Sequence, residues 1–204
     1  MSRIIAGTAG GLRLTSVPGE NTRPTTDRVK ESLFSKLESY GVVQGARVLD
    51  AYAGSGALGC EALSRGAASV EFVEKHPKAC EVTRRNVAAT SKTATGSITR
   101  VTQGSAQSYV AVHSGPWDLV FLDPPYAFTQ EQVLGILRVI TPNLVEGAIV
   151  VVERSSRDAE PAWNSRLRRF AMKKYGETVL YYLEPDESYT DTGSEPAESE
   201  NASC

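Results

Sequence analysis

Residues 48–59 read Val-Leu-Asp-Ala-Tyr-Ala-Gly-Ser-Gly-Ala-Leu-Gly. A short apolar run that ends in an acid and is followed by glycines predicts a buried strand, a tight turn and the start of a helix. Gly54, Gly56 and Gly59 fit the spacing G-x-G-x-x-G, and Glu74 follows about 20 residues later. In this pattern the glycine backbone approaches the cofactor, and the acid binds ribose hydroxyls. The segment therefore predicts a nucleoside cofactor at a strand–turn–helix unit.

Outward from this segment, strands and helices alternate from residue 47. Strand patterns fall at 47–51, 69–74, 98–102, 119–123 and 148–153, and helix patterns at 58–65, 77–90, 106–112 and 129–141. Thr129 and Gln132 stand in capping-box spacing at the start of the last helix. The alternation predicts an α/β fold with a mostly parallel sheet covered by helices on both faces. Residues 168–175 and 178–183 look instead like a closing hairpin.

The two ends of the chain differ from this middle part. Glycines and prolines separate two short strand patterns, 3–7 and 11–14, and a helix pattern follows at 26–40. Residues 185–204 are rich in Ser, Glu, Thr and Pro, a composition typical of disorder. We therefore expect three parts: a hairpin-and-helix extension at 1–44, an α/β domain at 45–184, and an acidic, disordered tail at 185–204.

Composition excludes several classes of protein. The net charge of −2 hides a basic body, because residues 184–204 hold seven acids, whereas residues 1–183 carry 22 basic against 17 acidic groups. No apolar run approaches the ~18 residues of a membrane helix, and the N-terminus does not read as a secretory signal. The sequence has an odd number of cysteines, and their spacing is not that of metal ligands: Cys60, Cys80 and Cys204. We expect a cytoplasmic monomer with no membrane partner, disulfide framework or metal.

A second motif, Asp123-Pro124-Pro125-Tyr126, follows the apolar run at 117–122. Two prolines cannot continue a central strand, because they lack the backbone N–H and fix φ. The acid therefore lies at the carboxyl edge of the sheet, where α/β folds bind ligands. A carboxylate, a rigid prolyl carbonyl and an aromatic ring can together hold a planar group that carries an NH2. Asp123, Pro124 and Tyr126 are the predicted catalytic residues.

Asp50 separates two cofactor hypotheses. A carboxylate four residues before the first glycine suits a pyrophosphate poorly, but it favours the ammonium and sulfonium of S-adenosylmethionine. Loop amides at the helix N-terminus can hold the carboxylate of the same cofactor. We therefore predict an S-adenosylmethionine site, formed by Asp50, Tyr52, Ala53, Gly54, Ser55, Gly56, Gly59, Glu74, Lys75, Ser105, Ala106 and Asp123.

Together these motifs resemble those of class I methyltransferases. Residues 50–56 look like their first motif, Glu74 like the acid of the second strand, and residues 123–126 like the amino-group motif of N-methyltransferases. With the segment 23–34 and the opening residues 3–7 and 11–14, the chain resembles the RsmD family over residues 2–184. Many class I methyltransferases carry an acid after the third strand that contacts adenine; here Ser105 or backbone groups would serve.

The resemblance implies a Rossmann-like, seven-stranded, mostly parallel sheet with an antiparallel last strand. It also implies transfer of a methyl group to the N2 amine of one guanine of 16S ribosomal RNA (guanine 966 in that family), within the small subunit or an assembly intermediate. Tyr126 would stack on a flipped base. RNA phosphates would be contacted by the basic N-terminal part, which supplies Arg3, Arg13, Arg23, Thr25, Arg28 and Lys30.

Four other functions compete with this hypothesis. A DNA adenine-N6 methyltransferase would use the same Asp-Pro-Pro-Tyr motif, but it would need an insertion that reads the duplex groove. A nicotinamide oxidoreductase would use the same glycines, but it would leave Asp50 and Asp123 without a role. A non-catalytic RNA-binding module would not need an intact Asp123 motif. A protein-glutamine methyltransferase would more usually carry Asn in place of Asp123.

Overall fold

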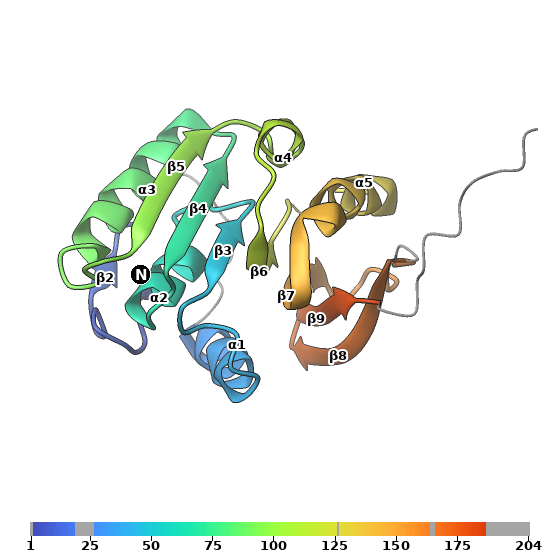
Figure 1. Cartoon of the computed structure of the whole chain (residues 1–204), viewed down its shortest axis with the longest axis horizontal. Coiled ribbons are helices and arrows are strands. Elements are labelled where there is room, and N and C mark those ends of the chain that lie inside the picture. Colours follow the sequence, from blue (N-terminus) through green and yellow to red (C-terminus); the bar gives the residue numbers. More distant parts are fainter. Residues whose placement is uncertain (1, 19–26, 126, 164–165, 187–204) are drawn as a thin grey trace, which may run out of the picture.

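The centre of the protein is a seven-stranded sheet with the strand order β5-β4-β3-β6-β7-β9-β8 (Figure 1). The computed structural model describes residues 2–18, 27–125, 127–163 and 166–186. Its strands are β3 (Arg47–Asp50), β4 (Ser69–Glu74), β5 (Ile98–Gln103), β6 (Trp117–Leu122), β7 (Leu144–Ser155), β8 (Leu167–Tyr175) and β9 (Thr178–Pro185). All pairs from β5 to β7 are parallel, whereas β9 is antiparallel to β7 and β8. The predicted mostly parallel sheet with an antiparallel last strand is confirmed.

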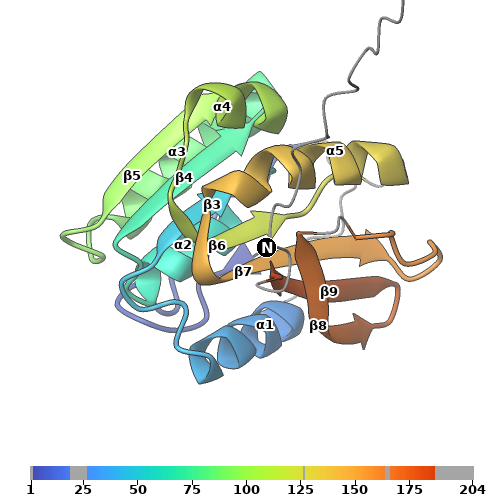
Figure 2. The ribbon, with the colours of Figure 1, turned by 45° about the vertical axis from the view of Figure 1, so that its right-hand side comes forward.

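Helices cover both faces of this sheet (Figure 2). The helices of the described chain are α1 (Asp27–Ser39), α2 (Ala57–Ser64), α3 (Pro77–Thr90), α4 (Ala106–Val112) and α5 (Gln130–Ile140). Side chains of α1, α2 and α3 form one core with the sheet, and those of α4 and α5 form the other. Successive strand residues such as Val48 and Leu49 enter opposite cores, because side chains alternate along a strand. Both strand faces are therefore apolar, as the unbroken apolar runs indicate.

Several boundaries differ from those expected. Strand β6 begins at Trp117 and ends at Leu122, so Asp123 lies just beyond it, where the two prolines end the pairing. The capping box at the start of α5 is present as predicted. The last strand extends through Pro185, which the sequence assigned to the tail. Residues 187–204 of that predicted tail lie outside the described residues.

The N-terminal segment forms a small sheet of its own, with only β1 (Ser2–Arg3) and β2 (Arg13–Leu14) as strands. The segment is held by the buried carboxylate of Glu61 on α2, which accepts the backbone N–H groups of Ile5 at 2.7 Å and Ala6 at 3.0 Å. Glu61 also accepts a hydrogen bond from Arg65 at 2.8 Å. This carboxylate thus joins the N-terminal extension to α2.

The structure contradicts one sequence prediction, the RNA contact assigned to Lys30. It was expected to contact RNA phosphates, but its side chain is fully buried. Its ammonium donates to the Ser2 hydroxyl at 3.1 Å and to the Arg3 carbonyl, and it lies 3.8 Å from Glu61. Burial lowers the pKa of Lys30, which Glu61 partly opposes. The prediction for Lys30 is wrong because the lysine lies on the apolar face of α1, beside Val29 and one turn from Leu33.

No helix in the part of the chain that the structure describes is long and apolar enough to span a membrane.

Removing the Glu61 carboxylate should destabilise the protein strongly. In Glu61→Ala the Lys30 ammonium stays buried with its charge uncompensated, which typically costs about 3–5 kcal/mol. Chemical denaturation should show this loss of unfolding free energy. The matched control is Glu38→Ala, because Glu38 binds the same Arg65 at 2.9 Å but is half exposed; it should cost about 1 kcal/mol or less. Equal losses in the two variants would contradict the role given to Glu61.

Candidate active site

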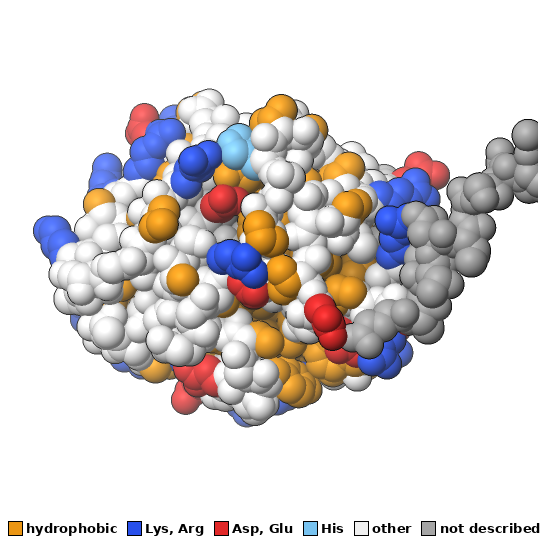
Figure 3. Space-filling model, viewed as in Figure 1, with side chains coloured by type: hydrophobic (Ala, Val, Ile, Leu, Met, Phe, Trp, Pro, Cys, Tyr) orange, Lys and Arg blue, Asp and Glu red, His pale blue; other side chains and the backbone are white. Residues whose placement is uncertain are grey.

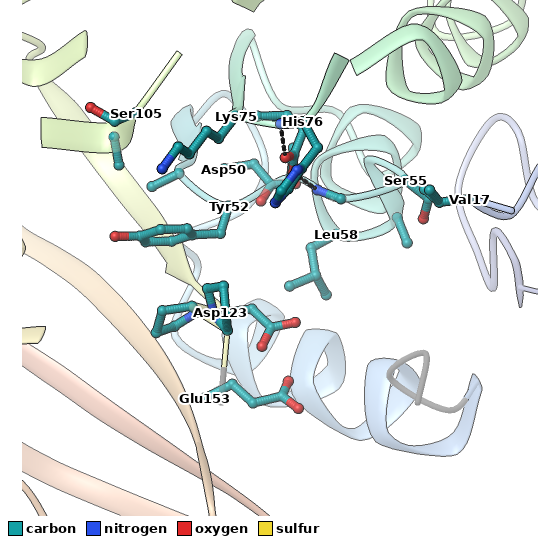
Figure 4. A pocket seen from close by; sticks show the side chains of 18 of the residues that line it. Val17, Asp50, Tyr52, Ser55, Leu58, Lys75, His76, Ser105, Asp123 and Glu153 are labelled. Atoms are coloured by element: carbon teal, nitrogen blue, oxygen red, sulfur yellow. Dashed lines mark hydrogen bonds between the residues drawn. The ribbon is translucent and has the colours of Figure 1, made fainter. Parts of the chain in front are cut away.

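A cavity of about 770 Å³ lies at the carboxyl ends of β3, β4, β6 and β7 (Figure 4). Its size is within the range of small-molecule sites, which is roughly 300–1,000 Å³. It is lined from the β3–α2 loop, from the ends of β4 and β7, from the start of α4 and from the segment that follows β6. The residues Ser2, Ser16 and Val17 of the N-terminal segment close one side. The cavity thus lies where the two sequence motifs meet.

The glycine loop is built around Asp50, the last residue of β3. Its buried carboxylate accepts the backbone N–H of Gly59 at 3.0 Å. Burial raises the pKa of Asp50 to about 7, and the nearby Glu74 adds to the increase, while the Gly59 N–H opposes it. A positive group in the cavity would stabilise the ionised form of this carboxyl.

The three glycines of the loop have different structural roles. Gly54 has φ +54°, a left-handed conformation that favours glycine, and a Cβ there would meet no atom within 4 Å. A Cβ on Gly56 would lie 2.9 Å from the Thr83 side chain, and one on Gly59 would lie 2.2 Å from the Phe72 ring. Gly54 therefore faces the cavity, whereas the other two let α2 pack against β4 and α3.

Glu74 at the end of β4 connects this loop to the next one. Its carboxylate accepts the N–H of Gly54 at 2.8 Å and the N–H of His76 at 2.7 Å (Figure 4). A carboxylate has about four acceptor positions, so these two bonds leave capacity for ribose hydroxyls. Lys75 and His76 also line the cavity.

Helix α3 braces the loop from behind. The Thr83 hydroxyl donates to the Gly54 carbonyl at 2.8 Å, and the buried Asn86 amide donates to the Ser55 carbonyl at 2.8 Å. The same Asn86 side chain exchanges two hydrogen bonds with the backbone of Thr15, at 2.8 and 2.9 Å. One asparagine therefore connects the glycine loop with the N-terminal segment.

Asp123 and Glu153 face the cavity from adjacent strands (Figure 4). In the β6–β7 register Leu122 pairs with Val152, so the two acids follow at the same level. Asp123 is exposed where it lines the cavity. Limited solvation there, together with the carboxylates of Glu153 and Asp50, raises the pKa of Asp123.

The segment after Asp123 is held as a turn. The Phe128 N–H donates to the Pro125 carbonyl at 2.9 Å, and the buried Arg154 guanidinium donates to the Phe128 carbonyl at 2.8 Å. The Phe128 ring packs edge-on against Tyr52, with the two ring centroids 5.5 Å apart. Burial raises the pKa of Tyr52 to about 12, so its phenol stays protonated. The turn thus brings an aromatic ring to the cavity wall.

The structure brings most of the predicted site residues together. The cavity is lined by Asp50, Tyr52, Ala53, Gly54, Ser55, Glu74, Lys75, Ser105, Ala106, Asp123 and Pro124. Gly56 and Gly59 do not line it, since they act through packing. Ser105 caps α4 by accepting the Ser108 N–H at 3.1 Å, and its role toward a cofactor stays a prediction. Arg23, Thr25 and Tyr126 lie outside the described residues.

The cavity residues that were not predicted from the sequence include Phe128, Gln107 and Glu153. Glu153 had a detectable signal, because it ends an apolar strand just as Asp123 follows one. Phe128 and Gln107 had no such signal. The loop and helix geometry that places them at the cavity cannot be inferred from the residues next to them in the sequence.

Known proteins provide an independent comparison. The family described as "Conserved hypothetical protein 95" matches residues 2–184. YlbH of Bacillus subtilis (strain 168) is 35% identical over 179 residues, which cover 86% of this chain and 95% of that protein. The chain belongs to this family, the RsmD/YlbH family. The family assignment made from the sequence is confirmed, and with it the assignment to the methyltransferases.

Two further proteins extend the comparison. The Escherichia coli (strain K12) ribosomal RNA small subunit methyltransferase D is 40% identical over 124 residues, 61% of this chain and 60% of that protein. The solved structure of Escherichia coli yhhF superposes with a TM-score of 0.77 at 31% identity, covering 90% of this chain and 97% of that one. The fold of the family therefore extends over nearly the whole described chain.

The different roles of the glycines can be tested by stability. Gly59→Ala should force the Phe72 ring to move, and such overpacking typically costs about 1–3 kcal/mol. Gly104→Ala is the control, because Gly104 also borders the cavity but a Cβ there meets nothing within 4 Å. Thermal unfolding should show a clear fall for Gly59→Ala and little change for Gly104→Ala. A Gly59→Ala protein with unchanged melting would contradict the packing role.

Proposed function

We propose that this chain transfers a methyl group from S-adenosylmethionine to the exocyclic N2 amine of one guanine in the 16S ribosomal RNA of the small subunit. The observation that carries the proposal is the placement of Asp123 and Pro124 opposite the glycine loop across a single cavity. An amine acceptor and a cofactor loop then face the same space. The likeness to ribosomal RNA small subunit methyltransferase D supports 16S ribosomal RNA as the substrate. Such a substrate also implies a cytoplasmic location.

The residues present fit S-adenosylmethionine. Asp50 suits an ammonium group, Glu74 keeps acceptor capacity for ribose hydroxyls, and Gly54 lets the backbone approach the ligand closely. The start of α4, with Ser105, Ala106 and Gln107, borders the remaining part of the cavity, where the adenine would lie. When bound, the cofactor would supply an electrophilic methyl group.

The amine-binding residues would act by orientation. The N2 lone pair of guanine is delocalised into the ring, so the amine is a poor nucleophile. Hydrogen bonds from N2 to the Asp123 carboxylate and the Pro124 carbonyl would hold the nitrogen in the reacting direction and favour its pyramidal form. Because the pKa of Asp123 is raised, the same carboxylate can also receive the proton that N2 loses.

Aromatic groups would hold the base after it leaves its stack. Tyr126 was assigned this role from the sequence, and we extend it to Phe128, whose ring lies at the cavity wall against Tyr52. A base must be extruded before its exocyclic amine can reach such an enclosed site. Figure 3 shows apolar side chains in the middle of the face seen there, with acidic and basic side chains among them and further basic side chains toward its margins.

The N-terminal segment would contact the RNA backbone. Arg3 and Arg13 are register partners on β1 and β2, so two positive charges lie together beside the cavity that Ser2 lines. Asp27 lies 3.2 Å from Arg3 and offsets part of this charge. Arg13 and Arg28 are exposed. We propose these arginines as phosphate contacts that position the substrate without reading its sequence.

Labelled cofactor tests the function directly. Labelled S-adenosylmethionine should mark unmodified 30S subunits or their naked RNA, and mapping should place the label on the N2 of one guanine. Asp123→Ala should abolish labelling while the affinity for S-adenosylmethionine, measured by calorimetry, stays within a few-fold. Label on adenine of DNA would contradict the proposal. Equal loss of methylation and cofactor binding would contradict the amine-orienting role of Asp123.

The phosphate contacts can be tested by salt dependence. Arg13→Ala should weaken RNA binding and reduce the slope of log affinity against log salt by about one contact, or ~0.7–0.9. Arg138→Ala is the control, because Arg138 is exposed near the end of α5, on the far side of the sheet from β1 and β2. Filter binding across a salt series would provide both values. Identical slopes for Arg13→Ala and the unaltered protein would remove Arg13 from the RNA surface.

A further inference from the structure

The C-terminal hairpin carries a lysine that the proposed reaction does not use. Lys173 is exposed on β8, which is an edge strand of the sheet. Its ammonium donates to the Ser32 hydroxyl of α1 at 2.9 Å and lies 5.4 Å from the centre of the Tyr175 ring. The Tyr175 hydroxyl donates to the same Ser32 oxygen at 2.6 Å. These contacts hold a flexible side chain between β8 and α1, which lie side by side in Figure 2.

The charge of Lys173 is not matched by a carboxylate. Arg168, near the start of the same strand, pairs with Glu184 at 2.7 Å. In the parts of the chain that the structure describes, no ion pair includes Lys173, and its hydrogen-bond partner Ser32 is neutral. An ammonium has three donors, so the bond to Ser32 leaves two of them. The side chain is therefore positioned to bind an anion.

The strand register places Lys173 at the level of the cavity. Lys173 pairs with Leu180 of β9, and Leu180 pairs with Glu153 of β7, which lines the cavity. Adjacent strands are about 4.8 Å apart, so two strand spacings separate the backbones of Lys173 and Glu153 by roughly 10 Å. Residues directly opposite each other in a sheet point to the same face. Lys173 thus lies on the same side of the sheet as the Glu153 wall of the cavity.

Helix α1 connects Lys173 to the arginines proposed above as phosphate contacts. Arg28 is exposed one turn before Ser32, and residues four apart on a helix have Cβ atoms about 5–6 Å apart. Asp27, next to Arg28, binds Arg3 of β1 at 3.2 Å. Exposed cations therefore continue from β1 over the start of α1 to β8.

The cavity lies between the two ends of this basic surface. Glu61 of α2 and Asn86 of α3 hold the N-terminal segment, and these helices pack against β3, β4 and β5. Strand β8 is the opposite edge of the sheet, and the cavity opens at the ends of β3, β4, β6 and β7. An RNA strand that contacts both ends would cross the cavity. Backbone contacts on both sides would fix the nucleotide whose base is extruded between them.

We propose that Lys173 contacts an RNA phosphate, and that Arg28, Ser32 and Lys173 form a second RNA-binding surface, the α1–β8 surface. This inference rests on the proposed function and adds the part of the RNA surface that lies beyond the cavity from the N-terminal hairpin. Lysines on an edge strand also discourage pairing with another sheet. That role would apply equally to Lys173 and to its neighbour Lys174, so the two lysines separate the alternatives.

The test compares these two neighbouring lysines. Lys174 is also exposed, but it points to the opposite face, because side chains alternate along a strand and its partner Val179 lies in the core of α4 and α5. Lys173→Gln removes the charge and can still donate to Ser32. For a naked 16S RNA fragment that contains the target guanine, it should reduce the slope of log affinity against log salt by about 0.7–0.9.

Filter binding across a salt series measures this slope. The advantage of the unaltered protein over Lys173→Gln should fall about 3-fold between 50 and 200 mM salt, as that slope difference requires. The matched control Lys174→Gln removes the same charge from the same strand and should keep the slope of the unaltered protein. Lys173→Arg keeps the charge and should keep the slope as well.

Four results would overturn the inference. They are an unchanged slope in Lys173→Gln, an equal reduction in Lys174→Gln, and a reduced slope in Lys173→Arg, which would indicate a structural effect. The fourth is weaker binding of Lys173→Gln to 30S subunits but not to naked RNA, which would assign the α1–β8 surface to a ribosomal protein. If the unaltered protein neither binds nor methylates 16S RNA, the proposed function fails, and this inference fails with it.

Discussion

Three carboxylates concentrated at the ends of three adjacent strands are the constraint around which the rest of the site is arranged. Asp50 ends β3, Asp123 follows β6 and Glu153 lies near the end of β7, and limited solvation together with the charges of Glu153 and Asp50 raises the pKa of Asp123. Parallel pairing makes this concentration unavoidable, because it brings the carboxyl ends of all three strands to one edge. Asp50 accepts the Gly59 N–H, and all three carboxylates line the cavity. In the proposed reaction, donors of the substrate would complete this arrangement.

The N-terminal segment is bonded to the elements that form the site. Glu61 fixes its first residues on α2, and Asn86 fixes Thr15 to the carbonyl of Ser55 in the glycine loop. Ser2, Ser16 and Val17 then form a side of the cavity. A segment proposed to contact RNA is thus bonded directly to the loop proposed to hold the cofactor. The division of the chain at residue 44 stays a prediction, although Ile4 and Leu33 enter the same core as Val48.

The sequence predicted the fold well for reasons that are local. Apolar runs of strand length, helix periodicity, glycines and a capping box all act between residues near in sequence, so α3, α4 and β4 were placed with their observed bounds. Asp50, Glu74 and Asp123 were found because each stands where an apolar strand ends. Lys30 was misassigned because its exposure depends on how α1 packs against Glu61 and the first residues of the chain. Charge alone does not reveal such a partner.

By itself the sequence determined the strand–helix order, the cofactor loop and the Asp-Pro-Pro turn, because periodicity and the restricted dihedrals of glycine and proline are properties of short segments. Only the tertiary structure decided which side chains meet. Strand register made Glu153 a neighbour of Asp123, the packing of α2 against Phe72 turned Gly59 into a structural residue, and the turn held by Arg154 brought Phe128 to Tyr52. These contacts join residues far apart in the chain, and their distances are set by the packing of the whole sheet rather than by any local pattern.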